Sequence, residues 1–387
     1  MIISDLGTII TGKTPTTKNE EFWNGKVQFV TPGDIQGTKH ISSTARYITE
    51  LGMKSVKGAI LPKDAVCVSC IGNIGYVGKT TEQCISNQQI NSIIVNEKHN
   101  SDYVYYLMKS LWPYFKNYEG QSTTLSILNK GQFSKIEVIE HTRKEEDAIA
   151  EILNGIDNKI ENNLIINDNL LQQAQSIFMQ MFGDITSVTM ATIADIALNI
   201  TDGVHNTVID DPEGQYLLLS CKNIKGGLLS IGTSERRINL ETFEKLRRRT
   251  KLAKGDILIS SVGTVGELLL LNTNPSNYEF QRSVAIVKPN PELVSSAYVY
   301  ESLVTKKAEL INAAHGAVQQ CLFISDIAGF PIGIPNPRDL RSFDDVVNPM
   351  FDTITANEGE NLRLEALRNI LLPKLMSGEL DVSDLDI

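Results

Sequence analysis

The sequence has few of the features that define membrane proteins, disulfide-rich secreted proteins or zinc enzymes. No apolar run in its 387 residues is long enough to span a bilayer, and the opening MIISDLGTII does not follow a secretory signal pattern. The five cysteines are an odd number, which fits reduced thiols better than a disulfide framework. The five histidines show no H-x-x-x-H or H-E-x-x-H spacing. We therefore expect a cytoplasmic protein without membrane association and without a metal site.

A nucleotide-binding loop is also missing. Residues 70–78, CIGNIGYVG, follow an apolar run and contain three glycines, but they match neither G-x-x-x-x-G-K-[ST] nor G-x-G-x-x-G. Cys67-x-x-Cys70 has no second cysteine or histidine pair at zinc spacing, which favours small strand residues. We expect the glycines to form a tight turn at the end of a strand.

An excess of basic residues, typical of chains that bind nucleic acid, is absent as well, because the formal net charge is −10. The distribution of charge changes this interpretation. Residues 143–168 have 3 basic and 7 acidic side chains, residues 338–387 have 5 and 11, and the rest of the chain has 28 of each. Residues 222–254 have ten Lys or Arg and three acids. A local basic surface of this kind can attract a polyanion.

What the sequence does contain is an internal repeat with a period of about 190 residues. The segment LPKDAVCVSCIGNIG (61–75) aligns with LAKGDILISSVGTVG (252–266), and SNQQINSIIV (86–95) aligns with YEFQRSVAIV (278–287). The offset drifts along the chain, as small loop insertions would produce. The repeat therefore predicts two copies of one structural unit.

The first part of each copy has the pattern of a mixed α/β domain. Helices are predicted over Asp102–Lys109 and Ser296–Leu310. Apolar runs bounded by glycine and asparagine predict strands at Val27–Val30, Ala65–Ser69, Ser92–Val95, Tyr216–Leu219, Ile257–Ser260 and Val284–Val287.

The second part of each copy is a long amphipathic helix. A helix of about 40 residues is about 60 Å long, and its single apolar stripe must be buried against a partner. Apolar residues recur at steps of three and four at Ile149, Leu153, Ile156, Ile160 and Leu164 in the first copy, and Val347, Phe351, Ile354, Leu367 and Leu371 continue the pattern in the second. We expect two globular domains, 1–142 and 185–337, separated by two antiparallel coiled-coil helices. The first helix is expected over 143–184, and the second, with a C-terminal tail, over 338–387. Asn163 and Asn167 interrupt the stripe and could fix its register.

Polar loop side chains in both copies are candidates for DNA contacts. Asn and Gln can bind adenine bidentately, and Arg can bind guanine. The strands repeat whereas these loop residues differ, as expected if each domain reads a different sequence. The candidates are Lys13, Thr14, Lys18, Thr31, Asn73, Asn87, Gln88, Gln89, Gln121, Ser122 and Thr123 in the first copy, and His205, Asn206, Lys222, Asn223, Thr264, Gln281, Arg282, Gln319 and Gln320 in the second.

Two other classes of protein remain open. Asn348-Pro349-Met350-Phe351 resembles the Asn-Pro-Pro-Phe loop of amino-methyltransferases that act on adenine, which would make the chain a stand-alone DNA methyltransferase. Met350 replaces the second proline and Phe351 falls on the helical stripe, so we expect a proline in a helix's first turn instead. The other alternative is a coiled-coil scaffold without DNA binding.

The ordered layout resembles one known family, the DNA-specificity subunit of type I restriction–modification systems. The resemblance covers nearly all 387 residues. It is carried by IISDLGTIITGKTP (2–15), VQFVTPGDI (27–35), the strand and glycines from Val68 to Gly75, Asn87-Gln88, ATIADIALNITDGVHN (191–206) and LLPKLMSGEL (371–380).

The resemblance implies a non-catalytic subunit with two target-recognition domains, 1–142 and 185–337, each binding one half of a split site in double-stranded DNA. It also implies that the helices set the spacing and dock two methyltransferase subunits, and that the complex recruits a restriction motor-nuclease. S-adenosylmethionine, ATP and Mg²⁺ would then be bound by those partners, with no cofactor on this chain. The acidic helices fit a protein-facing role.

Overall fold

The computed structural model describes residues 1–35, 39–120, 126–183, 188–204, 208–232, 235–316 and 320–382. The chain forms two compact units, one of Met1–Glu161 with Asn361–Ile387 and the other of Asn162–Glu360. Each unit includes part of both 40-residue helices, α5 (Arg143–Phe182) and α11 (Pro337–Met376). Within the described ranges, no helix is long and apolar enough to cross a membrane.

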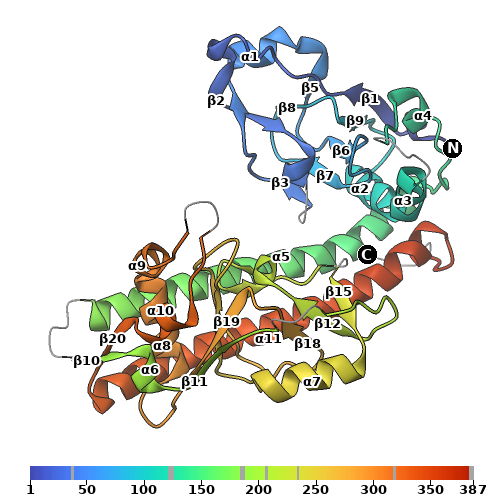
Figure 1. Cartoon of the computed structure of the whole chain (residues 1–387). Helices are drawn as coiled ribbons and strands as arrows, with labels where there is room; N and C mark the ends of the chain where they lie inside the picture. The colour runs from blue at the N-terminus through green and yellow to red at the C-terminus, as the bar shows by residue number, and fades with distance from the viewer. Residues whose placement is uncertain are drawn as a thin grey trace. The chain divides into compact units, whose positions relative to one another are not determined.

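The first unit contains two mixed sheets of short strands, drawn in blue to cyan in Figure 1. The larger has the order β1 (Gly7–Thr11), β9 (Ile90–Val95), β6 (Val66–Ser69), β7 (Val77–Thr80) and β3 (His40–Ile41). The smaller has the order β4 (Tyr47–Ile48), β2 (Trp23–Val30), β8 (Cys84–Ser86) and β5 (Ile60–Leu61).

The central strand β6 is buried on both faces, which explains its uninterrupted apolar sequence. Val66 and Val68 pack in the core beneath the helices, whereas Cys67 packs in the core on the other face. Cys70, just after the strand, belongs to the helix side. Burial raises the pKa of the Cys67 thiol to about 11 and that of Cys70 to about 12, so both are protonated at neutral pH.

Helices cover one face of the larger sheet. Asn100 caps the central one, α2, by accepting from the backbone N–H groups of Asp102 and Tyr103. The helices of this unit besides the two long ones are α1 (Glu50–Ser55), α2 (Ser101–Ser110), α3 (Trp112–Gly120) and α4 (Lys130–Ser134).

The second unit repeats this topology without counterparts of the edge strands β3 and β5 in its described sheets. Its larger sheet has the order β11 (Ala197–Asp202), β19 (Val284–Pro289), β16 (Ile257–Ser260) and β17 (Leu268–Leu270). In its smaller sheet, β12 (Tyr216–Leu219) pairs antiparallel with β15 (Arg236–Ile238) and parallel with β18 (Tyr278–Phe280), just as β2 pairs with β4 and β8. Two further sheets have two strands each. In one, β10 (Thr189–Thr192) pairs with β20 (Pro331–Ile334), and in the other, β13 (Ile224–Lys225) pairs with β14 (Leu228–Leu229). The internal repeat is therefore confirmed as a repeat of strand pairing.

The helix expected over Ser296–Leu310 is broken. The chain leaves the α8 conformation at Lys306, whose N–H bonds to the carbonyls of Ser302 and Val304, and a second helix follows. This break lets Leu310 turn into the core, where it is fully buried. The helices of this unit are α6 (Ile193–Ile196), α7 (Leu240–Thr250), α8 (Ser296–Thr305), α9 (Lys307–Asn312) and α10 (Ile324–Ala328).

Each long helix has one buried stripe. Apolar stripe residues lie in the cores of the units, and the expected positions Ile149, Leu153, Ile156, Ile160, Val347, Phe351 and Ile354 are all buried, with Leu371 half-buried beside them. Antiparallel pairing is direct in the second unit. Asn163 Nδ2 donates to Glu360 Oε2 at 2.8 Å, and Asn357 Nδ2 donates to Asn167 Oδ1 at 2.8 Å. The residue number rises along α5 while it falls along α11.

Two expected stripe positions lie outside the stripe. Leu164 is 43% exposed and Leu367 is 45% exposed. Leu164 lies eight residues after Ile156 and is therefore turned about 80° away from it around the helix. The buried position is taken by Asn163, and in α11 the half-buried Arg368 takes the place expected for Leu367. The heptad period continues along both helices, but some of its stripe positions are polar. A search for apolar residues alone therefore misses them.

Arg368 also has a partner on the stripe of the first unit. Its Nη1 donates to Asp157 Oδ1 at 2.5 Å, and the Tyr106 hydroxyl of α2 donates to Asp157 Oδ2 at 2.9 Å. Nearby carboxylates, chiefly Asp157, more than offset the burial of the guanidinium and raise the pKa of Arg368. The pair ties the end of α11 to the α2 side of the unit.

The segment Asn348-Pro349-Met350-Phe351 is helical. Pro349 lies twelve residues after the start of α11, so the expectation of a first-turn proline was wrong. Pro349 and Asp345 are both exposed, which leaves the carbonyl that loses its helical bond open to water. Phe351 packs its ring edge-on against Tyr300, with ring centroids 5.6 Å apart. The segment therefore has no resemblance in structure to a catalytic loop.

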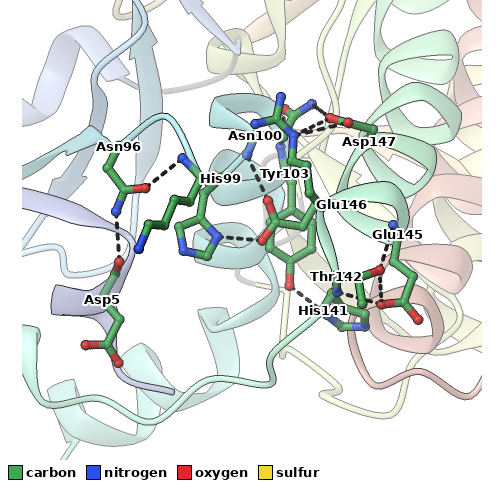
Figure 2. A network of polar contacts seen from close by, with 12 residues as sticks. Asp5, Asn96, His99, Asn100, Tyr103, His141, Thr142, Glu145, Glu146 and Asp147 are labelled. Atoms are coloured by element: carbon green, nitrogen blue, oxygen red, sulfur yellow. Dashed lines mark hydrogen bonds and ion pairs between the residues drawn. The ribbon is translucent and has the colours of Figure 1, made fainter.

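A polar network fixes the beginning of α5 (Figure 2). Thr142 and Glu145 form a capping box, in which the Glu145 carboxylate accepts from the Thr142 backbone N–H at 2.6 Å. Glu146 is 1% exposed, and its carboxylate contacts His99 Nδ1 at 2.7 Å and accepts from the Asn100 N–H at 2.8 Å. The start of the helix is thus anchored to the loop before α2.

Glu301 of α8 is also a buried acid, but its carboxylate differs from that of Glu146 in its hydrogen bonding. It is 1% exposed, and neither carboxylate oxygen has a hydrogen-bond partner among the described residues. Burial raises the pKa of this carboxyl from 4.5 to about 8. The folded protein therefore keeps a proton on Glu301 at neutral pH that the unfolded chain has released.

We expect this carboxyl to make stability depend on pH. Between about pH 4.5 and 8 the folded state binds more protons than the unfolded state, so the free energy of unfolding falls as pH rises across this interval. Glu301→Gln should remove that contribution and raise the unfolding temperature at pH 8 relative to pH 6, measured by thermal unfolding of the full chain. Glu292→Gln, a change at an exposed acid, is the control. Parallel pH profiles for the wild type and Glu301→Gln would contradict the assignment.

Candidate nucleic-acid interface

Two loops of the first unit lie side by side at the ends of its strands. A Cβ added to Gly12 would lie 2.1 Å from the carbonyl oxygen of Asn87, so glycine is needed for this close approach. Just beyond it, Thr14 Oγ1 donates to Gln88 Oε1 at 2.7 Å. Lys13, Thr14 and Gln88 are all exposed, and the structure brings these three candidates together.

The side chains of Asn87 and Gln89 form hydrogen bonds within the same loop. Asn87 Nδ2 donates to Gln89 Oε1 at 2.9 Å, and the Gln89 N–H donates to Asn87 Oδ1 at 3.0 Å. The Asn87 N–H donates to Val30 O, next to Thr31, whose hydroxyl donates to Asp34 Oδ2 at 2.6 Å. Asn87 is buried while Thr31 and Gln89 are half-buried, so these side chains hold the loop in shape.

The glycine stretch forms a turn beside this loop. The Cys70 N–H donates to Gln89 O at 2.7 Å, and the turn that follows has Gly72 at φ 77° and Gly75 at φ 98°. A Cβ on Gly75 would lie 2.9 Å from the Cβ of Phe115 in α3. The turn is therefore pressed against a helix, and the exposed Asn73 lies at its tip. This is the expected strand-end turn.

The second unit has the same turn with different side chains. Gly266 has φ 87°, and a Cβ there would lie 2.5 Å from Ile311 of α9. Thr264 is exposed at the tip, where the first unit has Asn73. The glycines are thus shared for packing reasons, while the residue between them differs.

The strand-end loops of the second unit also gather. The Gln281 N–H donates to Leu219 O at 2.8 Å, and the Arg282 N–H donates to Val204 O at 3.1 Å. Gln281 is half-buried and Arg282 is exposed. No hydrogen bond or ion pair engages the Arg282 guanidinium in the described part of the chain. This guanidinium is free to bind a ligand.

The side chains of Asn223 and Lys222 already bind other residues of the second unit. Asn223 is 1% exposed, and its amide donates to Ser230 O at 2.8 Å and to Glu235 Oε1 at 2.9 Å. Lys222 Nζ lies 2.9 Å from Glu235 Oε2. Asn223 therefore shapes its loop and leaves no surface for a base, whereas Lys222 is exposed.

Several candidates fall outside the described residues, namely Gln121, Ser122, Thr123, His205, Asn206 and Gln319. Two others, Lys18 and Gln320, are described and exposed. In the part of the chain that the structure describes, no group of three His, Cys, Asp or Glu side chains is arranged to hold a metal ion.

The basic segment 222–254 is partly neutralised by four acids, three of which lie outside the segment. Four of its ten cations have a carboxylate oxygen within 3.0 Å. In the most buried case, Arg247 pairs with Glu279, which is fully buried, and burial raises the pKa of that carboxyl against the effect of the guanidinium. Lys245 and Arg248 remain exposed on α7. The local positive potential is therefore weaker than the count of residues predicts.

One arrangement in the first unit had no sequence signal. The Arg46 guanidinium lies 4.0 Å from the centre of the Trp23 ring, and both residues line a cleft of about 640 Å³. The two residues are far apart in sequence and meet because β2 pairs with β4. A search for polar runs cannot detect such a pair.

Comparisons with known proteins agree on one family. A sequence model described as the type I restriction modification DNA specificity domain matches residues 1–172. The type I restriction enzyme MjaIX specificity subunit of Methanocaldococcus jannaschii is 28% identical over 421 residues, covering 99% of this chain and 93% of that protein. The HindI specificity subunit of Haemophilus influenzae is 35% identical over 144 residues, covering 37% of this chain and 31% of that protein.

A solved structure has the same fold. The type I restriction–modification system S subunit from M. genitalium aligns with a TM-score of 0.57 and 15% identity, covering 97% of this chain and 95% of that one. At this identity the likeness concerns the fold alone, and it agrees with the mixed α/β architecture and the long helices.

We expect Gly75→Ala to destabilise the first unit by about 1–3 kcal/mol, because the new Cβ meets Phe115 and a left-handed φ is strained for alanine. Chemical denaturation of the full chain measures the effect. Gly58→Ala, where an added Cβ meets nothing within 4 Å, is the matched control and should change stability little. Equal effects of the two changes would refute the packing role given to Gly75.

Proposed function

We propose that the chain is a member of the family of type I restriction–modification DNA specificity subunits, and that it selects a two-part DNA target for such a system. Each unit would bind one half of the site in double-stranded DNA. The subunit itself carries no chemistry in this proposal. Its role is to place catalytic subunits on a chosen sequence.

The observation that carries the proposal is that the two units repeat one scaffold but expose different side chains at the tips of their loops. Both units share the pairing of their central strands and the strand-end glycine turn. At matching loops, the first unit exposes Gln88 and Asn73, while the second exposes Arg282 and Thr264. An amide side chain suits adenine and a guanidinium suits guanine, so two such surfaces would recognise different bases.

Phosphate contacts would supply much of the affinity. Lys13 and Lys18 of the first unit and Lys245 and Arg248 of the second are exposed cations that could make them. Binding to double-stranded DNA should therefore weaken steeply as salt increases.

The long helices are the proposed docking surface for protein partners. Ile165 and Ile166 of α5 are 54% and 43% exposed in the second unit, and Leu362 and Ile370 of α11 are 62% and 58% exposed in the first. Large apolar side chains at this exposure, on helices with excess acid, suit a protein partner better than DNA. We propose that two methyltransferase subunits and a motor-nuclease assemble with this chain, and that S-adenosylmethionine, ATP and Mg²⁺ bind to those subunits.

The proposal predicts a gapped methylation motif. When the chain is expressed with its methyltransferase subunits, single-molecule sequencing of modified adenines should show two short specific segments with unspecified bases between them. A contiguous motif would contradict the proposal, as would methylation that does not depend on this chain. Expression of the methyltransferase subunits without the chain is the control.

Arg282→Ala should relax the specificity of one half of that motif and leave the other half unchanged. The exposed guanidinium can bind guanine, and its loss should reduce discrimination at one base pair by about 1–3 kcal/mol. Sequencing of modified adenines measures the change. Lys245→Ala, which removes an exposed charge from α7, is the control and should weaken binding without changing the motif. A uniform loss across all sequences with Arg282→Ala would identify a phosphate contact instead.

A further inference from the structure

The Arg46 guanidinium lies over the Trp23 ring and near the ring of Phe29. It lies 4.0 Å from the centre of the Trp23 ring and 5.6 Å from that of Phe29. Trp23 packs edge-on against Phe29 at 5.2 Å, and Phe29 is buried in the core. A guanidinium held over a ring in this way loses less conformational freedom when it binds, because its position is already restricted.

A distortion of strand β2 points Trp23 toward Arg46. The pairing of β2 with β4 shifts register between Trp23 and Val27, and Asn24 inside the bulge has φ 60°. A Cβ on Gly25 would lie 2.4 Å from the carbonyl oxygen of Ile48, so the bulge is pressed against β4. Bulges of this kind re-aim side chains, and they cluster near functional sites.

The donor groups of Arg46 have no hydrogen-bond partner among the residues that the structure describes. Arg46 is exposed, and neither a hydrogen bond nor an ion pair involves its guanidinium within the described ranges. Arg247 of the second unit gives the contrast, because it also lies over a ring, that of Phe243, at 4.9 Å. Its N–H groups bond to Glu279 and to the carbonyls of Pro275 and Tyr278. Arg247 therefore stabilises the fold, whereas the donors of Arg46 are available to a ligand.

The rest of the cleft favours a base pair over a phosphate. Of its described lining residues, two are charged, Arg46 and Glu20, and Asn24 adds an exposed amide. A phosphate group would be repelled by the Glu20 carboxylate. A G·C pair fits both charges, because guanine O6 and N7 accept from an arginine fork while the cytosine N4 amino group donates to a carboxylate.

The cleft is continuous with the loops already described. Trp23 Nε1 donates to Thr16 O at 3.2 Å, so the segment that bears the exposed Lys18 begins at the edge of the ring. On the other side, the Ala45 N–H donates to Asp34 Oδ1 at 2.8 Å, and Asp34 also binds Thr31. Arg46 therefore lies beside the loop surface to which DNA contacts are assigned.

We propose that Arg46 is a base-reading residue of the first unit, which recognises the guanine of one G·C pair while Glu20 accepts from the paired cytosine. This inference rests on the proposed function, and it adds a specific base pair to the first half-site. Trp23 acts as a positioning residue, since its ring holds the guanidinium in place.

The test uses the chain co-expressed with its methyltransferase subunits, and sequencing of modified adenines for each variant. Arg46→Lys keeps the charge but loses the fork, so methylation at sites with a wrong base should rise about tenfold or more at one G·C position. Glu20→Gln should relax the same base pair. Lys26→Ala removes an exposed cation of β2 that lies outside the cleft, and it should leave the motif unchanged. Thermal unfolding of each variant checks that the fold is intact.

The outcomes separate this inference from the function on which it rests. A gapped wild-type motif whose halves both stay unchanged in Arg46→Lys would overturn the assignment alone. So would a uniform loss of methylation at every sequence, which identifies a phosphate contact, or relaxation of different base pairs by Arg46→Lys and Glu20→Gln. A wild-type motif without a gap would overturn the proposed function and this assignment together.

Discussion

Both units depend on the burial of one stripe along each of the two long helices. A 40-residue helix with a single apolar stripe is not stable alone in water, because most helix stability in proteins comes from packing of that stripe. In the first unit, Leu153 of α5 and Leu375 of α11 belong to the same core as the larger sheet. In the second, Phe178 and Phe343 pack with ring centroids 5.9 Å apart. Neither unit has a complete core without both helices.

The polar residues on the stripe determine register more than they determine stability. Desolvation offsets most of the attraction between buried polar or charged partners, so pairs such as Asp157 with Arg368 contribute little net free energy. A shift of one helix along the other would leave these groups buried without partners, which costs about 1–3 kcal/mol for each group. The Asn167–Asn357 pair has the same effect in the second unit. The spacing along the helices is therefore specified by their least hydrophobic stripe residues.

The two units show how one scaffold accommodates two surfaces. The strand pairing and the strand-end glycines are kept because backbone geometry requires them, whereas the exposed side chains between them are free to change. The stacked arginines illustrate this freedom. Arg247 is committed to the buried Glu279, while Arg46 presents its donors outside the protein.

The sequence predicted those parts of the structure that depend on local pattern. The repeat, the strands and the heptad stripes follow from apolar spacing, and all of them are present. The prediction failed where a polar residue occupies a buried site, as Asn163 and Arg368 do in place of Leu164 and Leu367. It could not place Asn223 in the interior, since its partners are a carbonyl and a carboxylate in a later loop. It also missed Arg46, which meets Trp23 only through strand pairing.

The division of the chain into units has a consequence for the order in which they are completed during synthesis. The second unit is one continuous segment, Asn162–Glu360, and all of its residues are available before translation ends. The first unit contains the first 161 residues but also needs residues from Asn361 onward, including Leu375 and Met376 in its core. The first unit therefore starts before the second along the chain but is completed after it. Until the last turns of α11 leave the ribosome, part of the first unit's apolar core stays exposed to water. Nascent domains with exposed apolar surface are prone to aggregate.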